Sequence, residues 1–295
     1  MIRILGTTFA AVLGLAFGSF LNVCLSRWPE GESIVHPRSH CRNCTHTLSW
    51  WENIPLLSWL LLRGRCRTCR TAISWRYPLV EVAVGALWAW QAWQFLPWVF
   101  NVGTPSIFVA IHLVSTIGQM IFYWLLVALA MLDAENLWLP DSLTLIGAAL
   151  GLADTLLLAF LRSHVPNNDT VETGLLGQAL SAALAILAAA SLILLIRWLY
   201  KLIRHQEGIG LGDAKLMALL AAWLGLPGAL LAFALGSILG ALAALVLLAA
   251  PSARTNPKSW ATSKLPLGTF LCIGGIVSSL WGQPMIAAYL RWAGF

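Results

Sequence analysis

Long apolar runs follow one another along this chain, separated by short polar segments. The first, from Ile4 to Val23, has twenty residues and no charged side chain, about the length that a helix needs to cross a bilayer. Further runs lie at 78–102, 106–132, 143–161, 175–196, 214–226, 229–250 and 265–290, and only the one at 214–226 is short. The pattern predicts an all-α polytopic membrane protein with about eight transmembrane helices.

The composition also indicates that most of this chain lies in a lipid bilayer. Of the 295 residues, 59% are hydrophobic and 10% are charged, whereas a soluble domain carries roughly 25% charged residues. Basic residues follow the first run, so we expect a permanent span there and not a cleaved signal peptide. The net charge of +6 is then expected to reflect membrane topology, and no nucleic-acid partner is predicted.

The basic residues are distributed unevenly. If the N-terminus is periplasmic and eight spans follow, fifteen of the eighteen Lys and Arg residues fall in or beside the segments 27–77, 197–215 and 251–264. Lys and Arg gather in loops that remain in the cytoplasm. These three segments, and the loop 133–142 that falls on the same side of an eight-span chain, are therefore predicted to face the cytoplasm.

Four cysteines distinguish residues 27–77, which we call the cysteine lobe. They form two Cys-x-x-Cys pairs, Cys41 with Cys44 and Cys66 with Cys69, with twenty-one residues between the pairs. Two such pairs suit one tetrahedral Zn²⁺, and four thiolate ligands leave no open position for catalysis. The sequence predicts a structural zinc site here. Disulfide or redox roles are the alternative, which a reducing cytoplasm disfavours.

Two aspartates stand at the ends of apolar segments. Asp133 directly follows the run that ends at Leu132, where a carboxylate opposes the helix dipole. Asp213 ends a glycine-rich stretch and begins the short run at 214–226. Capping alone is one interpretation of Asp213, but ionisable groups in membrane segments usually mark function. We predict that Asp133 and Asp213 are catalytic.

Five further residues are candidates for supporting that site. Gly210 and Gly212 let the backbone approach a neighbour closely, and Lys215 follows in the same motif. Asp141 can either cap the next helix or support the site, and Glu81 lies one turn inside the second span.

A pair of carboxyl groups indicates one chemistry. When two approach within hydrogen-bonding range they share a proton, so that one activates water as a base while the other polarises a carbonyl as an acid. The pair then hydrolyses an amide. An ion-coupled transporter and a zinc-containing membrane scaffold remain alternatives.

The same residues lie in motifs that resemble the type IV prepilin peptidase family of the bacterial inner membrane. The similar segments are 18–23 (GSFLNV), 37–39 (PRS), 52–59 (ENIPLLSW), 63–66 (RGRC), 76–81 (RYPLVE), 132–141 (LDAENLWLPD) and 207–216 (EGIGLGDAKL). Many relatives carry Asp where this chain has Glu135, which is not the residue matched as catalytic.

The resemblance implies a bifunctional enzyme. It would cut the basic leader from prepilins or pseudopilins at the cytoplasmic face, then methylate the new N-terminus with S-adenosylmethionine. Asp133 and Asp213 match the catalytic pair and the four cysteines match the zinc ligands. The implied division is a first transmembrane helix at 1–26, a methyltransferase-associated lobe at 27–77 and a protease bundle at 78–295. A protease without methyl transfer is the alternative.

Overall fold

The computed structural model describes residues 1–101, 103–165, 174–205, 210–249 and 265–294. Within these ranges all regular structure is helical and no strand occurs. In the described part of the chain, six helices are long and apolar enough to cross a membrane. The all-α polytopic prediction is thus confirmed, whereas the total of eight spans stays a prediction.

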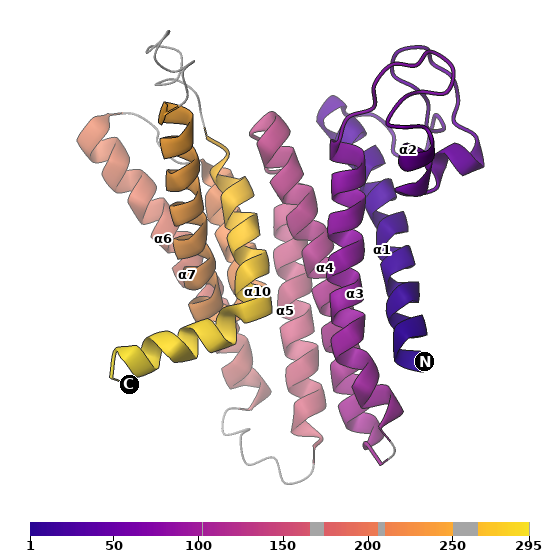
Figure 1. The fold of residues 1–295 in the computed structure, drawn as a ribbon. Coiled ribbons are helices and arrows are strands. Elements are labelled where there is room, and N and C mark those ends of the chain that lie inside the picture. The colour runs from indigo at the N-terminus through magenta and orange to yellow at the C-terminus, as the bar shows by residue number, and fades with distance from the viewer. Residues whose placement is uncertain (102, 166–173, 206–209, 250–264, 295) are drawn as a thin grey trace. The chain divides into compact units, whose positions relative to one another are not determined.

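The chain forms two compact units, and the first comprises Met1–Ala128. Its helices are α1 (Ile2–Arg27), α3 (Arg76–Phe100) and most of α4 (Ser106–Asn136), which lie side by side in Figure 1. The cysteine lobe connects α1 to α3 and contains the short helices η1 (Trp28–Glu30), η2 (Trp50–Asn53) and α2 (Leu57–Leu61).

Glycines bring α1 and α3 into close contact. A Cβ atom on Gly18 would lie 2.7 Å from the Glu81 Cα, and one on Gly14 would lie 2.9 Å from the Gly85 Cα. Small residues allow this approach in membranes, where packing replaces the hydrophobic effect between helices. Tryptophan N–H groups connect these helices to α4, since Trp88 donates to the Met120 carbonyl at 2.9 Å and Trp124 to the Phe17 carbonyl at 3.2 Å.

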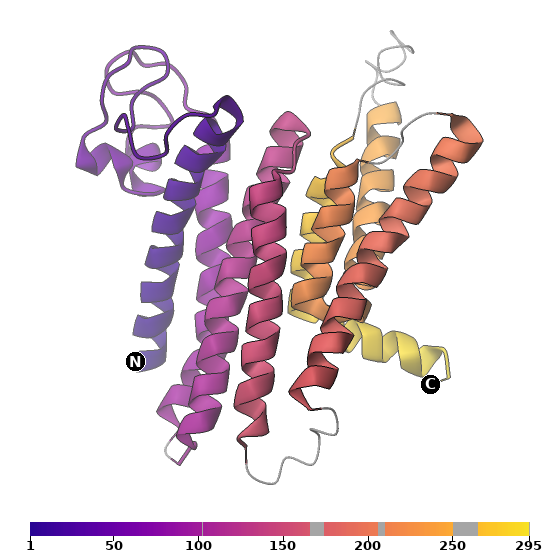
Figure 2. The ribbon, with the colours of Figure 1, turned by 180° about the vertical axis from the view of Figure 1, so that it is seen from behind.

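The second unit, Leu129–Phe295, begins in the last turns of α4. It continues with α5 (Asp141–Ser163), α6 (Leu175–Arg204), α7 (Leu211–Ala249) and α10 (Leu267–Trp292). Figures 1 and 2 show α7 beside α6, and α10 packs along α7. α10 contains Pro284, and its C-terminal part turns away from its first part in Figure 1, as proline in a helix causes.

A break divides α7 into two helical segments. Gly225 has φ 67° and ψ 176°, outside the helical region, and Pro227 follows it. The separate runs expected at 214–226 and 229–250 correspond to the segments on either side of this break. Positive φ costs glycine little, and the proline ring starts a new helix readily.

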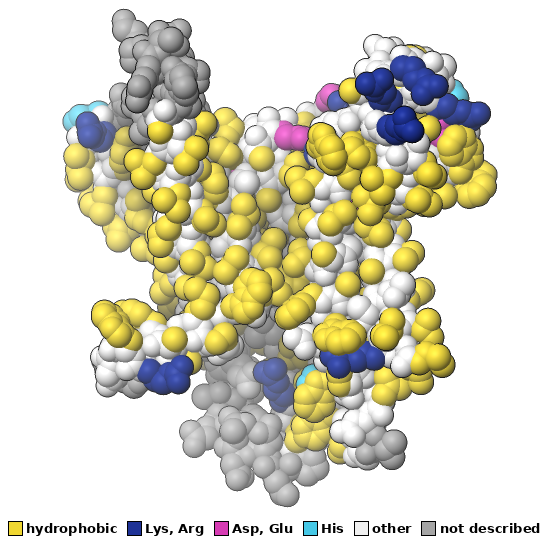
Figure 3. Space-filling view, viewed as in Figure 1, with side chains coloured by type: hydrophobic (Ala, Val, Ile, Leu, Met, Phe, Trp, Pro, Cys, Tyr) yellow, Lys and Arg dark blue, Asp and Glu magenta, His cyan; other side chains and the backbone are white. Residues whose placement is uncertain are grey.

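The surface has the character expected of membrane helices. Large apolar side chains are exposed along α1, including Phe9 at 70%, and along α6, including Leu176 at 75%. Figure 3 shows hydrophobic side chains over the helices and the Lys and Arg side chains gathered mainly on the cysteine lobe. Apolar side chains exposed along whole helices are typical of a surface that faces lipid or a partner protein.

Candidate active site

Asp133 lies in the last turn of α4 and is 6% exposed. Its Oδ2 accepts the backbone N–H of Thr269 at 2.7 Å and lies 3.3 Å from the Thr269 hydroxyl. The same hydroxyl lies 2.9 Å from the Ala130 carbonyl, so it can donate to either oxygen. Thr269 is in the first turn of α10, where free N–H groups and the helix dipole favour a carboxylate.

Asp213 is the third residue of α7 and is 8% exposed. Its Oδ2 accepts the backbone N–H of Gly210 at 3.2 Å. The carboxylate therefore turns back toward the residue before the helix, as the third residue of a capping box does. The beginning of the predicted glycine motif, residues 207–209, lies outside the described residues.

Leu139 connects the surroundings of the two aspartates. Cβ atoms on Gly212 and Gly268 would lie within 3.1 and 3.0 Å of this side chain, and the one on Gly268 would also lie 2.9 Å from Asp133 Oδ2. The two carboxyl groups are near enough to interact electrostatically. The structure thus brings Asp133, Asp213 and Gly212 into one neighbourhood.

Lys215 and Asp141 form an ion pair beside this neighbourhood. Lys215 Nζ donates to Asp141 Oδ1, and the two side chains are 34% and 65% exposed. Asp141 is the first residue of α5, after the N-cap Pro140, and makes no side-chain cap bond. Asp141 thus contacts the helix that carries Asp213, and its support of the site stays a prediction.

Glu81 belongs to the first unit, whereas the residues described above belong to the second. It is 6% exposed, and its Oε2 accepts the backbone N–H of Leu56 at 2.7 Å. It therefore anchors the segment between η2 and α2. Its support of the aspartates stays a prediction.

The four lobe cysteines converge on one point. The Sγ atoms all lie within 4.8 Å of one another, with 3.8 Å between Cys41 and Cys69 and 3.9 Å between Cys44 and Cys66. Ligands at a Zn–S distance of about 2.3 Å in a tetrahedron stand about 3.8 Å apart. The cluster thus has the chemistry and spacing of a four-thiolate zinc site.

The two cysteine pairs repeat one local structure. The Cys41 N–H donates to the His46 carbonyl and the Cys66 N–H to the Thr71 carbonyl, each at 2.9 Å. Isolated bridges close both turns, His40 with Thr47 and Arg65 with Ala72. Each turn therefore points its two thiols inward in the same way.

Local hydrogen bonds favour the charged form of Cys69 and of Glu52, whereas at Cys44 the lowering effect of the His46 backbone bond is outweighed by burial and by the other three thiols, which raise its pKa to about 11. The Thr71 hydroxyl and then its backbone N–H lower the pKa of the Cys69 thiol to about 5, which favours the thiolate that binds metal. The backbone N–H of Ser49 donates to buried Glu52 at 2.8 Å and lowers the pKa of that carboxyl, helped by the Ser49 hydroxyl and His46. His46 Nε2 lies 3.4 Å from Glu52 Oε2.

Sequence reasoning missed Leu139, Gly268 and Thr269. Thr269 is 136 residues from Asp133, so no local pattern connects them. A signal exists nonetheless: a threonine follows Pro266 at the start of the last apolar run, next to a basic segment. Polar residues at that place can reach other helix ends on the same side of a membrane.

Comparison with known proteins assigns the chain to a family. Residues 12–95 match the bacterial peptidase A24 N-terminal domain, and residues 120–245 match the type IV leader peptidase family. Proteins named prepilin leader peptidase/N-methyltransferase are 34% identical in Stutzerimonas stutzeri and 35% in Pseudomonas putida. The alignments cover 96% and 98% of this chain, and 93% and 95% of those proteins.

A third protein of that name, from Pseudomonas aeruginosa, is 32% identical over 96% of this chain and 93% of its own length. No solved structure matches the chain. Two family matches in the expected order, and full-length relatives above 30% identity, leave one conclusion. The chain belongs to the type IV leader peptidase family.

Proposed function

We propose that this enzyme removes the leader from prepilins or pseudopilins and then methylates the new N-terminal amine. Membership of a peptidase family, with relatives named for both activities, supports a protease and methyltransferase. The observation that carries the proteolytic half is that Asp133 and Asp213 are the buried acids among the described residues of the second unit. The transporter and scaffold alternatives lose their support.

Asp133 is the general base of the proposed reaction. Two donors from Thr269 face its Oδ2, and hydrogen bonds to a carboxylate stabilise the ionised form. It takes a proton from a water molecule as the water oxygen bonds to the scissile carbonyl carbon. The pair of acids carries one proton between them before this step.

Asp213 carries that proton and is the general acid. It has the single Gly210 donor, and its protonated carboxyl group can donate to the substrate carbonyl oxygen as negative charge develops there. When the tetrahedral intermediate breaks down, its C–N bond cleaves. The proton held by Asp133 moves to the leaving nitrogen, and Asp213 recovers its own, which restores the pair.

The second activity needs a methyl donor, and the lobe needs a metal. S-adenosylmethionine would supply an electrophilic methyl group: the lone pair of the neutral N-terminal amine would bond to the methyl carbon as the carbon–sulfur bond breaks, the neutral thioether would leave, and the methylated ammonium would then release its extra proton to water. Cys41, Cys44, Cys66 and Cys69 would hold Zn²⁺, which contributes folding free energy to a lobe too small for a large core. No reaction step is assigned to the metal.

A cytoplasmic location of both sites in a bacterial inner membrane completes the proposal. The concentration of Lys and Arg in three segments supports an N-terminus in the periplasm. The leader of a prepilin is basic, and it remains on the cytoplasmic side by the same rule. Substrate and enzyme would thus present their reacting parts to one compartment.

Cleavage and methylation can be tested separately. Detergent-solubilised wild type, Asp133→Asn and Asp213→Asn are incubated with a prepilin, and products are read by mass spectrometry. Asp154→Asn is the matched control, because Asp154 also lies within a membrane helix but outside the site. A second substrate, a pilin peptide that already lacks its leader, reports methylation alone.

We expect leader loss with wild type and Asp154→Asn, and at least a thousandfold lower rate with either site variant. Both site variants should still methylate the pre-cleaved peptide, which proves that they are folded. Normal cleavage by both site variants would rule out the aspartate mechanism. If wild type removes the leader but the product never gains the mass of a methyl group, the enzyme is a protease without transferase activity.

A further inference from the structure

A pocket lies within the first unit, where α1 meets the cysteine lobe. Its volume is about 430 Å³, in the range of small-molecule sites. Arg27 of α1 and Arg38 of the following loop line it together with a few uncharged polar and several apolar side chains. No acidic residue is among the described residues that line it, so the charge of the pocket suits an anion.

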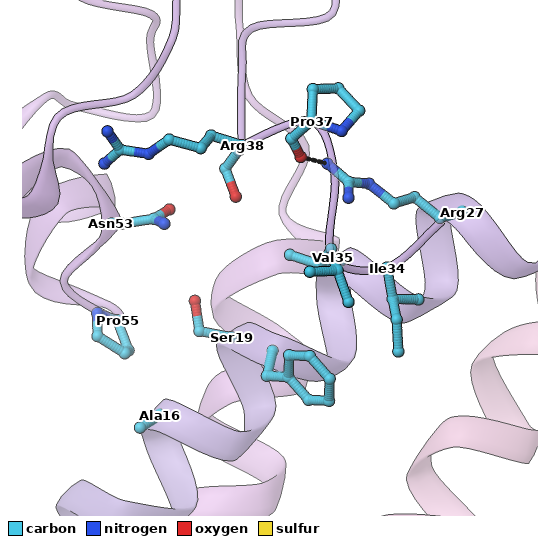
Figure 4. A pocket seen from close by; sticks show the side chains of 12 residues that line it. Ala16, Ser19, Arg27, Ile34, Val35, Pro37, Arg38, Asn53 and Pro55 are labelled. Carbon is cyan, nitrogen blue, oxygen red and sulfur yellow. Dashed lines mark hydrogen bonds between the residues drawn. The ribbon is translucent and has the colours of Figure 1, made fainter. Parts of the chain in front are cut away.

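The charged and the apolar groups lie at different levels of this pocket. Figure 4 shows Arg27 and Arg38 near the top of the view, Ala16 of α1 near the bottom, and Ile34 and Val35 between them. A ligand that fills the pocket therefore needs an anionic end and an apolar end.

We propose that this pocket binds an anionic phospholipid, with its phosphate toward Arg38 and an acyl chain along α1. The inference goes beyond the two proposed reactions and depends on neither of them. A lipid bound in this way contacts both α1 and the loop that follows it, so it attaches the cysteine lobe to the membrane surface.

Uncompensated positive charge is the first argument. Arg27 is 6% exposed, and its guanidinium donates to the carbonyls of Ser33 at 2.8 Å and Pro37 at 2.6 Å. In the described part of the chain, neither Arg27 nor Arg38 has a carboxylate within ion-pair distance. Arg38 is exposed, and a guanidinium binds phosphate through two parallel N–H groups. In Figure 4 its side chain extends to the side of the view where Asn53 lies, whose amide can donate to another headgroup oxygen.

An apolar stripe on α1 is the second argument. Residues three or four positions apart lie on one face of a helix, and here that face carries Phe9, Leu13, Ala16, Phe20 and Val23. The last three line the pocket, and Phe9, Leu13 and Phe20 are exposed. The stripe thus leads from the pocket along the membrane-spanning part of α1. An acyl chain that packs on it covers apolar side chains while the headgroup stays at the end of the helix.

The place of the pocket is the third argument. It lies where a membrane helix ends and a polar lobe begins, which is the level of lipid headgroups. Arg42 donates to the Ser26 carbonyl at 3.1 Å, so a third arginine lies at the C-terminal end of α1. Basic pockets at the cytoplasmic ends of membrane helices bind anionic headgroups, and the distribution of Lys and Arg predicts that side for residues 27–77.

Hydrogen bonds hold the wall of the pocket in place. The two Arg27 bonds fix the carbonyls on either side of Ile34 and Val35. Glu81 accepts the N–H of Leu56, next to the lining residue Pro55. Two buried charged residues thus fix the backbone around the opening, which is typical of a preformed site.

Lipid binding is measured on the full-length protein, freed of lipid in a neutral detergent, by native mass spectrometry with added phosphatidylglycerol. Phosphatidylcholine with the same acyl chains tests the need for net negative charge, and inorganic phosphate as a competitor tests whether a free anion suffices. Arg38→Ala removes the charge, Arg38→Lys retains it and Val35→Trp fills the pocket. Arg204→Ala is the control, because Arg204 is likewise exposed but ends α6 in the second unit. Size-exclusion chromatography of every variant checks its folding.

We expect wild type to bind phosphatidylglycerol at least tenfold more tightly than phosphatidylcholine, a difference of about 1.4 kcal/mol. Arg38→Ala and Val35→Trp should each raise the Kd for phosphatidylglycerol at least tenfold, whereas Arg38→Lys and Arg204→Ala should stay within about threefold of wild type. An excess of inorganic phosphate should not displace the lipid, because phosphate lacks the acyl chain.

Equal affinities of wild type for the two lipids would overturn the inference, and this comparison needs no variant to fold. A phosphatidylglycerol Kd that Arg38→Ala and Val35→Trp leave unchanged would overturn it too. Displacement by inorganic phosphate would assign the pocket to a soluble anion instead. If Arg38→Ala raises the KM for a prepilin in lipid-free detergent while the lipid Kd is unchanged, the pocket belongs to the protein substrate and the inference is wrong.

Discussion

The backbone N–H of Thr269 donates to Asp133 Oδ2 at 2.7 Å, across 136 residues of sequence. This bond places the first turn of α10 against the last turn of α4. The Asp133 carboxylate therefore lies at the C-terminal end of α4 and at the N-terminal end of α10. The Thr269 hydroxyl adds a second possible donor at 3.3 Å. Asp133 is therefore oriented by a residue that itself need not touch the substrate.

Replacement of Thr269 by valine should reduce catalysis without unfolding the protein. The backbone bond remains, but the hydroxyl donor to Asp133 is lost, which we expect to lower kcat about tenfold with little change in KM. Steady-state cleavage of a prepilin measures both constants. Thr269→Ser retains the hydroxyl and should restore the rate, and a serine variant as slow as the valine variant would contradict this role.

Gly268→Ala should have a larger effect. Its new Cβ would lie 2.9 Å from Asp133 Oδ2 and 3.0 Å from Leu139 Cδ1, so the carboxylate must move. A shift of about 1 Å in a catalytic group can cost about a hundredfold in rate, and we expect that loss in the cleavage assay. Gly174→Ala is the control, because nothing lies within 4 Å of a Cβ there.

The ion pair of Lys215 and Asp141 should matter for activity more than for stability. Both side chains are substantially exposed, and exposed pairs contribute only about 0–1 kcal/mol. Because Lys215 is two residues from Asp213, Lys215→Asp and Asp141→Lys should each slow cleavage several-fold. The double exchange should recover most of the rate, and additive losses in this double-mutant cycle would exclude a functional contact.

Zinc removal should separate the two activities. Elemental analysis of wild type should give one zinc per chain, and Cys44→Ser with Cys66→Ser should abolish it. We expect these variants to lose methylation and retain leader cleavage, because the aspartates and their partners lie in the other compact unit. Cys24→Ser is the control, since Cys24 is buried in α1 and outside the cluster.

The stability of the lobe should depend on acid through Glu52. Its pKa is lowered in the folded state by the Ser49 N–H bond first, so it stabilises the fold above its unfolded pKa of about 4.3. That contribution disappears as pH falls through the lower folded value. Wild type should therefore lose stability between these values more steeply than the near-isosteric Glu52→Gln, as followed by tryptophan fluorescence on acid titration.

Much of the fold could be predicted because lipid imposes a simple rule. A chain in a bilayer must form helices to satisfy its backbone, so the run at 143–161 already indicated α5 at 141–163. Aspartates and paired cysteines were conspicuous for a similar reason, since charged groups in helices and closely spaced thiols are rare without function. Their chemistry is visible in the residue types alone.

Contacts between distant helices could not be predicted in this way. Thr269 and Leu139 have ordinary side chains, and their importance depends on which helix ends meet. The position of Glu81 likewise depends on packing. Gly18 of α1 lets the Glu81 backbone approach closely, and the Glu81 carboxylate accepts the Leu56 N–H of the lobe. Such relations follow from three-dimensional packing, which periodicity does not encode.

The Gly225 break gives α7 two independent attachments. The segment with Asp213 is fixed to α5, where Trp223 donates to the Gly147 carbonyl at 2.9 Å and Thr155 to the Ala222 carbonyl at 3.2 Å. The segment after the break is fixed to α10 by the Ser278 bond to the Gly228 carbonyl at 2.8 Å. One stretch of chain therefore forms two separately anchored segments: the first carries Asp213, and the second packs against α10, whose Thr269 orients Asp133.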